Sequence, residues 1–126
     1  MLDQEKLVAF VPSRDPKTAK SFFIDVLGLH FISEDQFAVI FDANGITIRL
    51  VDVSSVTDFK PAAFTILGWS VKDIKETVRG LQERGITFER YPGMTQDDLG
   101  IWVTPSGAKV AWFKDPDGNT LSVGQR

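Results

Sequence analysis

Hydrophobic and polar positions follow two different rhythms along this chain, and the order of the rhythms is the same in both halves. The runs KLVAFV and FTILGWSV are strand-like, and each precedes a stretch with apolar residues three and four positions apart. Shorter alternating runs then flank turns that contain glycine. Each half therefore predicts a strand, a helix and three further strands.

Both predicted helices carry start and stop signals. In the first helix Asp15 is the expected N-cap, Pro16 takes the first helical position, and Gly28 ends the helix. In the second helix Asp73 is the expected N-cap and Gly85 the stop. The apolar residues of each helix lie on one side, so we expect each helix to cover one face of a sheet.

The hairpins that close the two halves repeat each other. DANGITIRLV and DPDGNTLSV share the order Asp-x-Asn/Asp-Gly-x-Thr followed by alternating aliphatic positions. Arg49 and Ser122 are therefore equivalent positions. Both Asn-Gly and Asp-Gly suit a two-residue hairpin turn with positive φ.

The repeat also relates the opening strands. Counting back seven residues from each helix cap makes Val8 equivalent to Ile66. Between the halves, SSVTDFKPA has turn residues and no periodicity, which is typical of a connection. We predict one domain over residues 1–126, with modules of about 5–53 and 63–126 and a linker of about 54–62.

Strand parity assigns the side chains to two faces, because alternate residues of a strand point to opposite sides. In the first hairpin, a two-residue turn at Asn44-Gly45 places Phe41 and Ile48 under the helix and Arg49 on the opposite side. The same reasoning at the second hairpin predicts two sets. Under the helix we expect Trp112, Leu121 and Val123, and on the other face Ala111, Phe113, Thr120 and Ser122.

The face turned away from the helix is called the open face below. We expect it to be mostly apolar in both halves, with Arg49 as its one arginine. An apolar surface with few polar groups is typical of small-molecule sites. The alternative is that this face is core between the two halves and that Arg49 pairs with a carboxylate. The sequence leaves both interpretations open.

Composition narrows the class of protein. The 126 residues carry a net charge of −3 without a basic cluster, which argues against nucleic acid as a partner. No apolar run is long enough to span a membrane, and the first residues, MLDQEK, contain no secretory signal. Cysteine is absent, so thiolate chemistry and disulfides are excluded. We expect a soluble cytoplasmic protein.

Two stretches resemble a known family. SFFIDVLGL and KDPDGNTLSV are similar to motifs of the vicinal oxygen chelate superfamily, which includes glyoxalase I, the fosfomycin- and bleomycin-resistance proteins and the extradiol dioxygenases. The resemblance implies an α+β fold in which two βαβββ modules form a curved mixed β-sheet around a cleft. It also implies a homodimer.

The resemblance bears on metal binding as well. In metal-dependent members, His or Gln, Glu, His and Glu from the first and last strands of each module hold a divalent ion. Carried onto this sequence, those positions fall on Val8, Arg49, Ile66 and Ser122. Val and Ile have no donor atom, Ser is a weak donor, and Arg brings a positive charge. We therefore expect no metal and no other cofactor, and the sequence does not decide whether the chain is an enzyme.

The leading hypothesis is a metal-free protein that binds a small, largely apolar, anionic molecule, like the bleomycin-resistance branch in mode. Arg49 is the expected polar anchor. The other expected ligand-binding residues are apolar walls, an aromatic cover and the serine on the open face: Phe10, Ile40, Phe64, Ile66, Phe113, Trp102 and Ser122.

Two alternatives stay open. One is a lyase, isomerase or dioxygenase of the same superfamily that uses displaced metal ligands, or Asp42, Asp97 or Asp98, although a solvated loop is the simpler interpretation of the last two. The other is an accessory or dimerisation domain whose concave face is closed by a partner chain. No catalytic residue is predicted.

Overall fold

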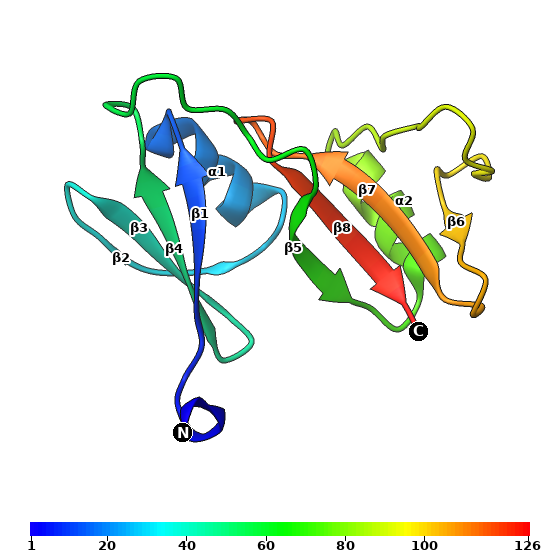
Figure 1. The fold of residues 1–126 in the computed structure, drawn as a ribbon, viewed down its shortest axis with the longest axis horizontal. Helices are drawn as coiled ribbons and strands as arrows, with labels where there is room; N and C mark the ends of the chain where they lie inside the picture. Colours follow the sequence, from blue (N-terminus) through cyan, green and yellow to red (C-terminus); the bar gives the residue numbers. More distant parts are fainter. The chain divides into compact units, whose positions relative to one another are not determined.

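The computed structural model describes all 126 residues, which form two compact units, residues 1–60 and 61–126 (Figure 1). Each unit contains one four-stranded mixed sheet and one α-helix, in the order strand, helix, strand, strand, strand. This confirms the α+β class and the predicted βαβββ order in each half. The two units are described one at a time.

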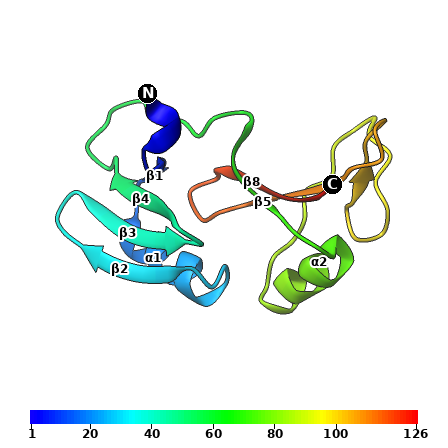
Figure 2. The same cartoon turned by 90° about the horizontal axis from the view of Figure 1, so that it is seen from below.

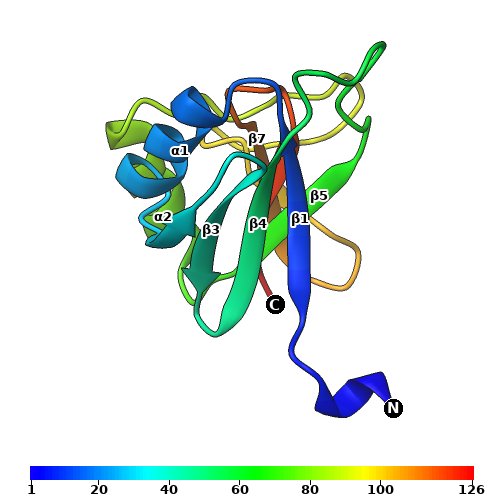
Figure 3. The same ribbon diagram turned by 90° about the vertical axis from the view of Figure 1, so that its left-hand side faces the viewer.

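Unit 1 begins with a short 3-10 helix and continues through its first strand, its helix and three more strands. These elements are η1 (Leu2–Gln4), β1 (Val8–Ser13), α1 (Pro16–Asp25), β2 (His30–Glu34), β3 (Ala38–Ala43) and β4 (Ile46–Asp52). The strand order is β1-β4-β3-β2, with β1 parallel to β4 and the other pairs antiparallel. Figure 3 shows β1, β4 and β3 side by side.

Unit 2 repeats this plan with a longer connection after its helix. Its elements are β5 (Thr65–Ser70), α2 (Ile74–Glu83), β6 (Trp102–Val103), β7 (Lys109–Lys114) and β8 (Thr120–Gln125). The strand order is β5-β8-β7-β6, with β5 parallel to β8. Figure 2 shows α2 on one face of this sheet. None of the helices in the chain combines the length and the apolar character needed to cross a membrane.

The helix signals act as predicted. The Asp15 carboxylate accepts hydrogen bonds from the Thr18 backbone N–H (3.3 Å) and hydroxyl (2.7 Å), which satisfies one of the donors left free at a helix start. Gly28 has a φ of +73°, which lets the chain reverse after α1. In α2 the Asp73 carboxylate accepts from the Glu76 N–H at 3.2 Å.

Each helix buries its apolar side on its own sheet. In unit 1 the rings of Phe23 and Phe41 meet edge to face at 5.6 Å, and both side chains are fully buried. In unit 2 Ile74 and Val78 of α2 are buried on the sheet, where Phe113 meets Phe88 at 5.5 Å. These contacts form a separate core for each unit.

The first hairpin confirms the predicted turn. Asn44 and Gly45 have φ values of 51° and 91°, and the register pairs Phe41 with Ile48 and Ile40 with Arg49. Phe41 and Ile48 are buried under α1, so Arg49 faces the open side of the sheet as expected.

The second hairpin does not have the predicted two-residue turn. Lys114 pairs with Thr120, so the connection consists of the five residues Asp115–Asn119. A two-residue turn would have paired Phe113 with Ser122, but the structure pairs Phe113 with Leu121. The change of one residue in register reverses the face of every side chain in β7.

Three face assignments are therefore wrong. Trp112 pairs with Ser122 and lies on the open face, whereas Ala111 and Phe113 lie under the helix and have no exposed surface. The predicted faces of Leu121, Val123, Thr120 and Ser122 agree with the register.

The physical reason lies in the first residue of the loop. The buried Asp115 carboxylate accepts hydrogen bonds from the backbone N–H groups of Asp117 and Asn119, both at 2.9 Å, and from the Asn119 amide at 2.8 Å. The Asp115 N–H also donates to the Asn119 carbonyl at 3.0 Å. These bonds close the loop from residue 115 to residue 119.

Candidate functional site

The open face of unit 1 carries Arg49 between two apolar neighbours. The register places Phe10 of β1, Arg49 of β4 and Ile40 of β3 in one row across the sheet. Phe10 is 65% exposed, and Arg49 is half-buried although it lies on an inner strand. A charged group between two apolar side chains can hold the polar and the apolar part of one ligand, so the row is a candidate binding surface.

No carboxylate of unit 1 neutralises this arginine at close range. Arg49 takes part in no ion pair within its unit. The pKa of Asp35 is lowered mainly by the backbone N–H groups of Phe37 and Ala38, and only to a lesser degree by the charge of Arg49. The alternative in which Arg49 simply pairs with a carboxylate therefore has no support within unit 1, and its donors stay available.

On the open face of unit 2, small side chains lie on one half of the sheet and bulky side chains on the other half. Two successive rows of the sheet have small residues on β5 and β8 and bulky residues on β7 and β6. The first row is Gly68, Ser122 and Trp112, and the second is Ser70, Gly124, Val110 and Trp102. A Cβ atom at Gly68 would lie 2.6 Å from the Ser122 Oγ, so glycine is the residue that fits beside this serine.

The bulky side chains include an aromatic cluster centred on Trp112. Its ring lies 5.6 Å from Tyr91 at an interplanar angle of 81°, and 6.1 Å from Trp102 at 31°. Burial, and to a lesser degree the charge of Glu89, raise the pKa of Tyr91, so its phenol is neutral at ordinary pH. All three residues are half-buried, so each keeps part of its surface exposed.

The connection that supplies Tyr91 is held by Gln96. Its side-chain carbonyl accepts from the Tyr91 N–H at 2.8 Å, and its amide donates to the carbonyls of Glu89 and Gly100, both at 2.9 Å. Gln96 also forms an isolated bridge with Trp102. The long segment after α2 is thus tied to the aromatic cluster.

Two of the three acidic residues considered for acid–base chemistry, Asp97 and Asp42, bind backbone N–H groups. The Asp97 carboxylate accepts from the N–H groups of Leu99 and Ile101, both at 2.9 Å, which closes a tight turn. The Asp42 carboxylate accepts from the Gly45 N–H at 3.2 Å. A carboxylate that holds a turn in this way has a structural role, and neither geometry indicates a catalytic one.

The predicted site residues fall into four groups. Phe10, Ile40 and Arg49 share the open face of unit 1, and Trp102 and Ser122 share that of unit 2. Phe64 precedes β5 and is 69% exposed, while Ile66 lies where the β5–β8 register is irregular, between Thr65 and Leu67. Phe113 is fully buried under the helix, so it does not line the open face.

Sequence reasoning missed the central member of the aromatic cluster. A two-residue turn in the second hairpin, as the sequence predicts, places Trp112 on the helix side. The available signal is the pair Asp115 and Asn119, since an aspartate at the start of a loop can accept N–H groups two and four residues later.

The residues at the metal positions of the resembling family do not fit a metal. Val8 and Ile66 offer no donor atom, and the Arg49 guanidinium would repel a cation. Only Ser122 has an oxygen, and a neutral hydroxyl is a weak ligand. In the whole chain, no group of three His, Cys, Asp or Glu side chains lies close enough to hold a metal.

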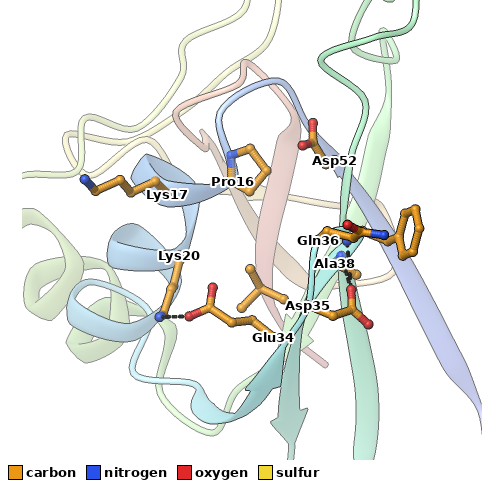
Figure 4. A pocket seen from close by; sticks show the side chains of 10 residues that line it. Pro16, Lys17, Lys20, Glu34, Asp35, Gln36, Ala38 and Asp52 are labelled. Carbon is orange, nitrogen blue, oxygen red and sulfur yellow. Dashed lines mark hydrogen bonds and ion pairs between the residues drawn. The ribbon is translucent and has the colours of Figure 1, made fainter.

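Unit 1 also has a pocket on its helix side, with a volume of about 400 Å³ (Figure 4). Lys20 points to Glu34 there and forms an ion pair of 2.6 Å, while the Asp35 carboxylate accepts from the N–H groups of Phe37 and Ala38. Three charged side chains that line the pocket, Lys20, Glu34 and Asp35, therefore already have hydrogen-bond partners. The open faces are therefore the stronger candidates.

The comparisons with known proteins agree with this fold. The model of the Glyoxalase/Bleomycin resistance protein/Dioxygenase superfamily matches residues 7–123. No curated protein matches the chain. Among solved structures, a lactoylglutathione lyase from Agrobacterium tumefaciens is similar, with 18% identity, a TM-score of 0.74, and coverage of 97% of this chain and 93% of that chain.

Two further solved structures are similar over essentially their whole length. A member of the same superfamily from Sphaerobacter thermophilus DSM 20745 has 24% identity and a TM-score of 0.74, with 100% of both chains covered. TnmS3, an antibiotic-binding protein from Streptomyces sp. CB03234, has 21% identity and a TM-score of 0.70, with 99% of this chain and 98% of that chain covered. At identities this low, the structural similarity establishes a shared fold and nothing further.

Proposed function

This chain belongs to the Glyoxalase/Bleomycin resistance protein/Dioxygenase superfamily, and from that premise we propose that it binds a small, largely apolar, anionic molecule without a metal. The observation that carries the proposal is Arg49, which lies on an inner strand between Phe10 and Ile40 and has no carboxylate partner in its unit. The binding surface is the open face of the sheet.

The chemistry of Arg49 selects the ligand class. A guanidinium offers five N–H donors in a fixed plane and stays charged at every ordinary pH, so it suits a carboxylate, sulfonate or phosphate group. The apolar side chains of Phe10 and Ile40 on either side favour an apolar body attached to that group. Proteins with similar folds include both a lyase and an antibiotic-binding protein, so the fold does not specify the ligand. The ligand class must be inferred from the residues of the open face.

The first test is a binding titration with two probes that differ in charge. We expect octane-1-sulfonate to bind the wild type and octan-1-ol to bind more weakly. Replacing Arg49→Met removes a charge-assisted interaction worth about 1.5–3 kcal/mol in total, so the affinity for the sulfonate is expected to fall about 10- to 100-fold. Octan-1-ol is expected to bind both proteins equally.

The matched control is Arg79→Met, which makes the same change of charge on the exposed side of α2. It is expected to leave the affinity for octane-1-sulfonate within about twofold, because an exposed charge away from the site is screened by salt. Equal affinity of wild type and Arg49→Met for the sulfonate would contradict the proposed anchor.

The metal-free mode is tested by the metal content of the purified protein. We expect less than about 0.1 equivalent of any divalent metal per chain, because the residues at the family's metal positions are poor metal ligands. One equivalent of a bound divalent ion would instead favour an enzyme that uses displaced ligands.

We also propose that the chain forms a homodimer. Phe64 lies outside the row of Phe10, Arg49 and Ile40 and is 69% exposed, so its ring is available for contact with a second chain. Sedimentation analysis is expected to give twice the 14.0 kDa mass of the chain. A monomer at all accessible concentrations would contradict this part of the proposal.

A further inference from the structure

We infer that Asn44 is a site of spontaneous covalent modification, at which the side-chain amide loses ammonia and becomes a carboxylate. The inference goes beyond the proposed function and does not depend on it. Three observations carry it. The next residue is a glycine, both residues of the turn are exposed, and the Asn44 side chain takes part in no hydrogen bond.

The modification consumes water and no other reactant. The backbone nitrogen of Gly45 attacks the side-chain carbonyl carbon of Asn44 and forms a C–N bond. The bond from that carbon to the side-chain NH2 group breaks, and ammonia leaves with the proton of the Gly45 N–H. Water then opens the cyclic imide at one of its two C–N bonds. One opening gives aspartate, and the other gives isoaspartate, in which the main chain runs through the side-chain carbon.

The surroundings of Gly45 leave its nitrogen accessible. Glycine has no Cβ atom that would crowd the imide, and a Cβ atom built there would meet no other atom within 4 Å. The Gly45 N–H donates only to the two Asp42 carboxylate oxygens, at 3.2 and 3.5 Å, which are long distances for an N–H···O bond. Gly45 also precedes β4, so the hydrogen bonds of the sheet do not hold its nitrogen.

The other asparagine of the chain differs in each of these respects. Asn119 is 1% exposed, and its amide donates to the Asp115 carboxylate at 2.8 Å. It is followed by Thr120, whose branched side chain crowds the nitrogen that would attack. We expect Asn119 to remain an amide, so it serves as an internal control.

Modification of Asn44 would disturb the turn that sets the register of unit 1. Asn44 and Gly45 are the two residues of this turn, and Ala43 pairs with Ile46 directly beside it. Isoaspartate adds one carbon to the main chain here, so the two-residue turn no longer matches the pair that it connects. Either product also places a negative charge near the Asp42 carboxylate. We therefore expect the modified hairpin to be less stable.

The test is storage of the folded wild-type protein for several weeks, followed by tryptic digestion and mass spectrometry. Peptides 21–49 and 115–126 contain one asparagine each, Asn44 and Asn119. We expect a growing fraction of peptide 21–49 to gain about 1 Da and to separate into an aspartate and an isoaspartate form. Its rate is expected to exceed that of peptide 115–126 by about tenfold or more. Equal rates, or no change of mass in peptide 21–49, would overturn the inference.

Asn44→Gly is the matched variant, because Gly-Gly also suits the two-residue turn but offers no amide to react. After the same storage, we expect part of the wild type to unfold at a lower urea concentration than before, while the variant keeps its midpoint. If the stored variant loses as much stability as the stored wild type, the change arises elsewhere in the chain and the inferred effect on the hairpin is wrong.

Discussion

The hairpin of unit 1 and the hairpin of unit 2 have nearly the same sequence pattern but close their sheets in different ways. Asn44-Gly45 forms a two-residue turn, so Ile40 and Arg49 pair across it. In unit 2 the five residues Asp115–Asn119 form the loop, and Trp112 pairs with Ser122. An odd number of loop residues in place of an even number reverses the faces of one strand, and therefore the chemistry of the open face.

The two open faces differ as a result. Unit 1 presents an arginine between exposed or half-exposed apolar side chains, which favours an anionic group on an apolar body. Unit 2 presents the rings of Trp112, Trp102 and Tyr91 beside small residues of β5 and β8. A register with Phe113 on the open face would have removed Trp112 from this cluster and placed an indole in the core.

The largest expected effect comes from replacing Phe113 and Phe10, one at a time, by alanine. Phe113 is fully buried, so Phe113→Ala is expected to lower the free energy of unfolding by about 3–5 kcal/mol. Phe10→Ala on the open face of unit 1 is expected to cost less than about 1 kcal/mol, because Phe10 is 65% exposed. Urea denaturation measures both, and equal losses would show that the face assignment is wrong.

The next effect separates the aspartates of the two hairpins, Asp115 at the start of its loop and Asp42 within β3. Asp115→Asn replaces an acceptor-only carboxylate by an amide whose NH2 group faces the Asn119 amide, and a loss of about 1–3 kcal/mol is expected. Asp42→Asn disturbs only the bond from Gly45, so it is expected to cost less than about 1 kcal/mol. If the two variants unfold at the same urea concentration, the Asp115 network does not fix the loop.

The smallest effect is in the pH dependence of two carboxylates, Asp115 in unit 2 and Asp35 in unit 1. Burial raises the pKa of Asp115 above 3.8, despite the opposing hydrogen bonds from Asn119 and Asp117. In unit 1, hydrogen bonds from Phe37 and Ala38 lower the pKa of Asp35 below 3.8. Carbon-13 spectra of the carboxyl groups should show Asp115 titrating at the higher pH of the two.

The sign of the effect on stability follows from these directions. The folded state binds a proton at Asp115 more tightly than the unfolded state, so this group's contribution to stability falls as the pH rises from 3.8 through the raised pKa. For Asp35 the contribution is present above 3.8 and is lost as the pH falls through its lowered pKa. Opposite titration orders would refute the assigned environments.

Local signals in the sequence were sufficient for much of this fold. Asp15 and Asp73 cap their helices through their own side chains, and the left-handed residues Gly28 and Gly85 follow the helix ends, so each feature depends on only a few neighbouring residues. The internal repeat extended these signals to the equivalence of Arg49 and Ser122. The two-residue turn at Asn44 has positive φ at both central positions, which Asn-Gly favours.

The aromatic cluster could not be predicted in the same way. Its centre, Trp112, depends on the loop length that the buried Asp115 carboxylate sets through three hydrogen bonds. The position of Tyr91 depends on the Gln96 side chain in a segment without periodicity. Interactions between residues several positions apart, without a repeating pattern, decide both.

The most direct test of ligand binding on the open faces is calorimetric titration of octane-1-sulfonate into wild type and Arg49→Met. We predict saturable binding of one molecule per chain to the wild type, weakened about 10- to 100-fold in the variant. The absence of binding to the wild type, or equal dissociation constants for the two proteins, would contradict the proposal that Arg49 holds the anionic group of a ligand.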